Sequence, residues 1–210
     1  MEKIIHKLQE YIEEEILPRY RFFDKAHDTH HATTVIEQSL QLATHYNVDI
    51  NMVYTIAAFH DTGLCEGREQ HHTVSAHIVR TDKFLRTIFT AEQIATIADA
   101  VEDHRASNKQ PPRTIYGKIV AEADRLIDGE TIMRRTIQYG LAHYPEKSRQ
   151  EHYERACQHL NDKYGHNGYL QLWIPQSPNA ERLQQFRRII DDKESLLALF
   201  NRIFDEEKNS

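Results

Sequence analysis

The chain has 210 residues, of which 40% are hydrophobic, so it is long enough to bury a full core as one domain. Its formal net charge of −6 at pH 7 argues against a protein that grips long nucleic acids through bulk positive charge. The only two cysteines, Cys65 and Cys157, are far apart in the chain, which indicates a reducing compartment and no disulfide framework.

The N-terminal residues contain no apolar run of signal-peptide length, and no later run approaches the length of a membrane span. We therefore expect a cytoplasmic protein that does not contact membranes.

Apolar residues recur at helical spacing along most of the chain. The first stripe ends at Pro18, Asn51 is the candidate cap of the helix that leads to His60-Asp61, and Thr90 with Gln93 forms a capping-box pattern. Helices are expected at about 2–17, 29–46, 51–61, 69–88, 91–104, 114–127, 130–143, 147–164 and 180–206, the last as one helix or a pair.

Two stretches rich in proline or glycine are predicted to be loops, at 106–113 and 165–179. The longer loop carries Trp173 among other apolar residues, which favours packing on neighbouring helices over a substrate lid. No stretch shows a convincing strand alternation. The predicted fold class is therefore all-α.

The ionisable residues can be sorted by helical phase, since residues three or four apart share a face. His31 shares its face with Val35 and points inward, whereas His30 shares a face with Glu37 and points outward. The same reasoning places a small set of histidines and aspartates on apolar stripes, namely His31, His60, Asp61, His71, His104 and Asp124.

A single inward histidine is more often a hydrogen-bonded core residue than a metal ligand. Six such groups in one core are different, because each would leave buried polar atoms unsatisfied at a cost of about 1–3 kcal/mol. A bound cation satisfies all of them together, and the pattern therefore indicates a metal site.

The order His31, His60-Asp61, Asp124 resembles the H…HD…D signature of the HD-domain metal-dependent phosphohydrolases. The local contexts H-H-A-T-T-V, H-D-T-G and A-D-R-L are similar to those of the family. The resemblance spans roughly residues 25–130. It implies an HD-domain helical bundle at about 25–130 with a C-terminal helical extension at about 131–210, together one domain over residues 1–210.

Two further segments, Glu69–Ala76 and E-D-H-R at 102–105, resemble the extra histidines of HD enzymes that hold two metals. They point to His71 and His104, with His72 as the competing candidate beside His71. Leu64 replaces the lysine of the H-D-I-G-K pattern of several subgroups, and no G-Y-P element follows His104. These departures lower the weight of cyclic di-GMP and stringent-response substrates.

The resemblance implies one or two divalent cations per chain, and the ligand types suit Mn, Fe, Co, Ni, Zn or Mg. It implies a bridging Asp61 and a metal-bound hydroxide that attacks phosphorus, with His60, Asp61 and Asp124 as catalytic residues. The candidates for binding the phosphoryl oxygens are the nearby basic residues Arg105, Arg113, Lys118 and Arg125, although ordinary surface charge explains Arg113 equally well and explains Lys109 better.

The expected function is hydrolysis of a nucleotide or another small phosphate ester or anhydride. The expected partner is a small phosphorylated substrate and not a long nucleic acid. The alternative is a catalytically idle HD-type domain that binds a nucleotide or a protein partner.

Overall fold

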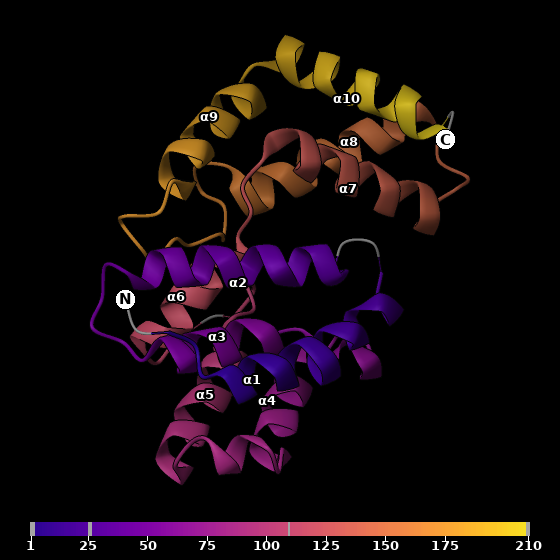
Figure 1. Ribbon diagram of the computed structural model, residues 1–210. Helices are drawn as coiled ribbons and strands as arrows, with labels where there is room; N and C mark the ends of the chain where they lie inside the picture. The colour runs from indigo at the N-terminus through magenta and orange to yellow at the C-terminus, as the bar shows by residue number, and fades with distance from the viewer. Residues whose placement is uncertain (1–2, 25–26, 109, 209–210) are drawn as a thin grey trace. The chain divides into compact units, whose positions relative to one another are not determined.

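The computed structural model describes residues 3–24, 27–108 and 110–208. Every regular element in these ranges is helical, which confirms the predicted all-α fold class (Figure 1). The chain forms two compact units. The core unit comprises Met1–Arg125 and Trp173–Ser177, and the C-terminal unit comprises Leu126–Leu172 and Pro178–Ser210. Lys109 lies outside the described residues, and the expected single-domain organisation stays a prediction.

The core unit is organised around helix α3, whose side chains from Met52 to Phe59 are all buried. Helices α2, α5 and α6 pack against it, and α4 packs against α5 (Figure 1). The α-helices of this unit are α1 (His6–Tyr11), α2 (Thr29–Ala43), α3 (Ile50–Phe59), α4 (His71–Thr81), α5 (Ala91–Asp103) and α6 (Ile115–Asp124). Short turns join them: η1 (Ile12–Ile16, a π-helix) and the 3-10 turns η2 (Leu17–Phe22), η3 (Thr62–Glu66) and η4 (Leu85–Thr87).

Three local expectations were wrong. The helix expected at about 69–88 ends at Thr81, and the separate 3-10 turn η4 follows it. Pro18 does not end the first helical segment, because proline fits the first turn of the following 3-10 helix, η2. Asn51 does not cap α3. Asp49 is the cap and accepts from the amide of Asn51, while the Asn51 side chain accepts from the amide of Ile5 at 2.9 Å. The capping box of Thr90 and Gln93 at the start of α5 is confirmed.

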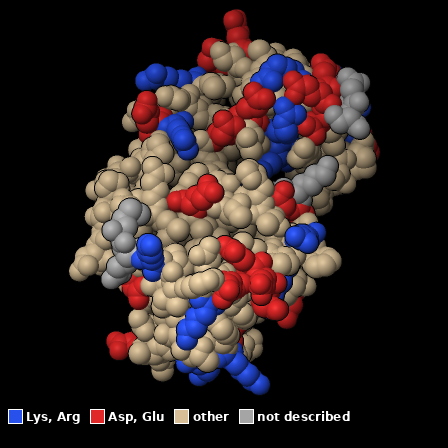
Figure 2. All heavy atoms as spheres, viewed as in Figure 1, with Lys and Arg blue, Asp and Glu red and all other residues tan. Residues whose placement is uncertain are grey.

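Four helices form the C-terminal unit: α7 (Gly129–His143), α8 (Arg149–Tyr164), α9 (Asn179–Asp191) and α10 (Lys193–Lys208). Each contacts the next along the chain, and α10 returns to pack on α7. Ion pairs reinforce this last contact, since Arg134 on α7 binds Glu206 and Glu207 on α10. Figure 2 shows basic and acidic side chains in mixed groups on one face of the molecule.

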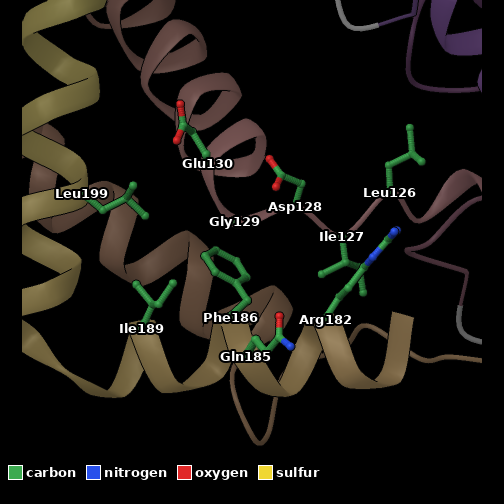
Figure 3. Close-up of a pocket in the computed structure, with 10 residues that line it drawn as sticks. All are labelled: Leu126, Ile127, Asp128, Gly129, Glu130, Arg182, Gln185, Phe186, Ile189 and Leu199. Carbon is green, nitrogen blue, oxygen red and sulfur yellow. The ribbon is translucent and has the colours of Figure 1, made fainter. Parts of the chain in front are cut away.

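A groove of 550 Å³ opens in the C-terminal unit, beside the start of α7 (Figure 3). Phe186 forms part of its wall and packs so closely on Gly129 that a Cβ there would lie 2.7 Å from the ring. Among the 10 lining residues there is no histidine or cysteine, so the groove offers no nitrogen or sulfur metal ligand of those types.

The segment Trp173–Ser177 leaves the C-terminal unit and packs in the core unit. The amides of Trp173 and Ile174 donate to the buried carboxylate of Glu122 on α6, at 2.6 and 3.4 Å. Ile174 is buried in the core. This arrangement fits the packing role that the sequence favours over a lid.

No helix within the described residues is both long and apolar enough to cross a membrane.

Candidate metal centre

His31 lies in the first turn of α2, where its position is fixed by the helix cap. Asp28 is the N-cap, and its carboxylate accepts from the amide of His31 at 2.9 Å. His31 is buried, whereas the adjacent His30 is exposed, as helical phase predicts.

The end of α3 presents the His60-Asp61 doublet, and side chains satisfy the backbone carbonyls that the helix leaves without partners. His60 Nδ1 donates to the carbonyl of Ala57 at 2.7 Å, and the Tyr20 hydroxyl donates to that of Ala58 at 2.9 Å. The amide of Asp61 then donates to the Tyr20 oxygen at 3.2 Å. The helix end therefore fixes both members of the doublet.

Gly63 allows helix α4 to approach the doublet. Its amide donates to Ser75 Oγ at 2.8 Å, and a Cβ at this position would lie 2.1 Å from the carbonyl oxygen of His71. A side chain at residue 63 would therefore push away the first turn of α4. That turn carries His71.

The two remaining histidines are oriented by backbone carbonyls of their own turns. His71 Nδ1 donates to the carbonyl of Arg68 at 2.8 Å, and His104 Nδ1 donates to that of Val101 at 2.6 Å. His72 belongs to no cluster of metal-ligand type in the described part of the chain. The geometry thus favours His71 over its neighbour.

Asp61 lies between two pairs of histidines. Its Oδ2 is 3.2 Å from His60 Nε2 and 3.7 Å from His31 Nε2. Its Oδ1 is 3.4 Å from Nε2 of both His71 and His104. Asp124 Oδ1 is 3.3 Å from His31 Nε2 and 3.8 Å from His60 Nε2. All six residues selected from the sequence therefore converge, as two triads: His31, His60 and Asp124, and Asp61, His71 and His104.

The tautomers of these histidines suit a cation. A carbonyl oxygen can only accept, so Nδ1 carries a proton in His60, His71 and His104, and Nε2 is the ring atom that faces the cluster. The facing Nε2 atoms lie 3.3 Å apart in the His31–His60 pair and 3.2 Å apart in the His71–His104 pair. Two nitrogens about 2.1 Å from a shared cation would lie about 3.0 Å apart at a right angle and about 3.4 Å apart at a tetrahedral angle. The residues present thus fit a metal ion in each triad.

The acidic members stay ionised. Burial opposes the charge of Asp61 and Asp124, but the neighbouring histidines outweigh it and hold both carboxyl pKa values below their ordinary range. Burial likewise opposes protonation of His31, yet hydrogen bonds to Asp124 and Asp61 raise its pKa to about 9. Burial and the charge of His104 lower the pKa of His71 to about 4. The two carboxylates and His71 are thus in the forms that bind metal, whereas metal binding by His31 displaces its proton.

The four basic candidates differ in their surroundings. Arg105 donates to the carbonyl of Glu69, just before α4, and Arg125 is buried with Nε unpaired among the described residues. Lys118 is half-buried on α6. Arg113 is held by carboxylates of α5 and forms ion pairs with Glu102 and Asp103 at 2.7 and 2.8 Å. The structure therefore surrounds Arg113 with compensating charge.

Sequence reasoning missed Tyr20 and Glu122, both fully buried with polar groups directed at backbone atoms. Neither belongs to a recognisable motif. The sequence does suggest that Glu122 is buried, because it follows the apolar Val120 and Ala121. Its role as an acceptor depends on Trp173, which lies 51 residues further along the chain.

Comparison with known proteins agrees with this centre. Residues 29–128 match the family model of the HD domain. A solved structure, the crystal structure of a predicted HD superfamily hydrolase from an uncultured Thermotogales bacterium, shares 26% sequence identity with a TM-score of 0.53. The similarity covers 66% of this chain and 78% of that one. The comparison with curated proteins gave no match.

Residues 29–128 of the chain therefore form an HD domain. The HD domain, the hydrolase neighbour and the two triads together support a metal-dependent hydrolase.

Proposed function

We propose that this protein is a phosphohydrolase that uses metal-bound hydroxide to hydrolyse a nucleotide or another small phosphate ester or anhydride. The observation that carries the proposal is Asp61, whose two oxygens are divided between two pairs of inward-facing histidines. This is the arrangement expected of a carboxylate that bridges two cations.

In this proposal His31, His60, Asp61 and Asp124 would hold one cation, and Asp61, His71 and His104 would hold the second. Imidazole and carboxylate donors without thiolate suit Mn, Fe, Co, Ni or Zn, and less readily Mg alone. Such cations lower the pKa of coordinated water from about 15.7 towards 7 and so supply hydroxide at neutral pH.

The side chains of the chain itself orient the substrate and balance its charge. Arg105 lies near enough to His72 that its charge, after burial, lowers the pKa of that histidine. Arg105, together with Lys118 on α6 and Arg125 directly after Asp124, is proposed to face the phosphoryl oxygens, where fixed positive charge stabilises the transition state. Arg113 contributes less, because Asp99, Glu102 and Asp103 already balance its charge.

The intact ligand set favours an enzyme over a catalytically idle domain that binds a nucleotide or a partner. Each triad keeps all of its histidine and aspartate members. Loss of any one would have favoured the idle domain.

The test is a phosphate-release screen on the full chain, supplied in turn with Mn²⁺, Fe²⁺, Co²⁺, Ni²⁺, Zn²⁺ and Mg²⁺. The panel includes nucleoside mono-, di- and triphosphates, cyclic nucleotides, sugar phosphates, and RNA and DNA oligomers. We expect turnover of a small phosphate compound, abolished in His31→Ala and retained in His30→Ala, which removes the exposed neighbour. Nucleotide binding without hydrolysis under any metal would support the idle domain instead, and cleavage of polymers alone would contradict the proposed substrate class.

A further inference from the structure

Tyr20 is the largest fully buried side chain of the described residues, and its hydroxyl lies at the edge of the metal centre. It comes from the turn η2 and precedes residues 29–128, so the HD family model does not include it. Its ring centre is 6.2 Å from that of His60.

The hydroxyl spans the break at which α3 ends. It donates to the carbonyl of Ala58 and accepts from the amide of Asp61. Both directions are fixed, because a carbonyl only accepts and an amide N–H only donates.

The backbone of Asp61 has left the helix, with φ −108° and ψ 6°. The Tyr20 hydroxyl holds the amide at this point, and the direction in which the carboxylate leaves the backbone decides whether its two oxygens reach both histidine pairs.

We propose that Tyr20 is a positioning residue of the metal centre: its hydroxyl holds the Asp61 backbone so that the carboxylate is shared between the two triads. The inference rests on the proposed function, since it takes Asp61 as the bridge between two cations. Mutation of a group that orients a metal ligand typically weakens metal affinity about 10–100-fold.

The first experiment titrates metal-free protein with Co²⁺ and follows binding by visible absorption. Tyr20→Phe keeps the ring and removes only the hydroxyl. We expect it to bind at least one of its two cations about 10-fold more weakly than wild type, with an altered cobalt spectrum. The matched control is Tyr11→Phe, which removes a hydroxyl that donates to Asp82 at 2.5 Å in the same unit but contacts no triad residue. The control should keep wild-type affinities and spectrum.

A second measurement uses wild-type protein and does not depend on the folding of a variant. Coupling between two events is reciprocal, so if the Tyr20–Asp61 bond favours metal binding, metal must favour the bond. Saturation with Zn²⁺ should therefore slow hydrogen exchange of the Asp61 amide about 10-fold or more, the change that corresponds to the affinity effect.

The outcomes separate the two proposals. Wild type that binds no Co²⁺ or Zn²⁺ overturns both. Wild type that binds both cations, with unchanged affinities and spectrum in Tyr20→Phe, overturns the role of Tyr20 and leaves the proposed function intact. Should Tyr20→Phe fail to fold, an Asp61 amide that exchanges equally fast with and without Zn²⁺ likewise overturns the role of Tyr20.

Discussion

Replacing His104 with alanine should remove one of two metal ions and leave the other bound. His104 Nε2 lies 3.4 Å from Asp61 Oδ1 and 3.2 Å from His71 Nε2, so the substitution deletes one of three protein donors in the second triad. The first triad of His31, His60 and Asp124 keeps all its donors.

The magnitude follows from the number of donors lost. Changes to groups that merely orient a ligand cost 10–100-fold in metal affinity, so loss of a direct donor should cost about 100-fold or more, about 2.7 kcal/mol. At a Mn²⁺ concentration of 100 times the wild-type Kd, the second ion stabilises the folded protein by about 2.7 kcal/mol. If His104→Ala weakens the second site 100-fold, the same Mn²⁺ concentration equals the Kd of the variant. The stabilisation of the folded variant by this ion is then about 0.4 kcal/mol.

Two assays measure this. Mass spectrometry of metals after dialysis should give two ions per chain in wild type and one in His104→Ala, with phosphate release largely lost. Urea unfolding with and without Mn²⁺ should show the reduced stabilisation. His72→Ala is the matched control and should resemble wild type, whereas Asp61→Asn should weaken both ions. A wild type that clearly holds one ion, with an unchanged count in His104→Ala, would refute the two-metal reasoning.

The remaining predictions concern the buried His152 in the C-terminal unit and the close contact between Gly63 and helix α4. His152 is buried in the C-terminal unit, and neither ring nitrogen has a hydrogen-bond partner among the described residues, so His152→Leu should stabilise the protein by about 1 kcal/mol in urea unfolding at pH 7. Burial and the charge of Arg155 lower the pKa of His152 in the folded protein. In the unfolded chain the same imidazole takes up a proton near its ordinary pKa of about 6.5, so acid favours the unfolded state. Wild type should therefore lose stability relative to His152→Leu as the pH falls from 7.5 to 5, and parallel curves would contradict this. Gly63→Ala should cost about 1–3 kcal/mol and weaken the second ion, because its Cβ would meet the carbonyl of His71. Gly67→Ala, whose Cβ would meet nothing within 4 Å although its φ is +100°, should lose some stability and keep both ions.

Helical phase selected the residues that converge, except that the choice of His71 over His72 came from the resemblance of its segment to the family pattern. His31 and its neighbour His30 illustrate why, since one is buried and the other exposed, as the 3.6-residue period requires. Phase is a local property, so it can be read along a single helix. The order of the motif then indicated that the helices meet at one centre, and the family model agrees over residues 29–128.

The local sequence pattern did not predict a contact correctly where more than one partner was chemically acceptable. Asp49 and Asn51 are both good helix caps, and the structure uses Asp49 because the Asn51 side chain binds the amide of Ile5 from a distant segment. Arg113 lies beside the motif in sequence, but the carboxylates of α5 surround it.

The division of the Asp61 oxygens between two histidine pairs was decided by tertiary structure. It depends on Tyr20 from η2, on the bare Cα of Gly63 and on His104 from α5, three contacts from separate parts of the chain. The sequence determines which side chains face inward, because the backbone repeat sets their direction. Which atom faces which other atom depends on non-local packing, and periodicity along the chain carries no information about it.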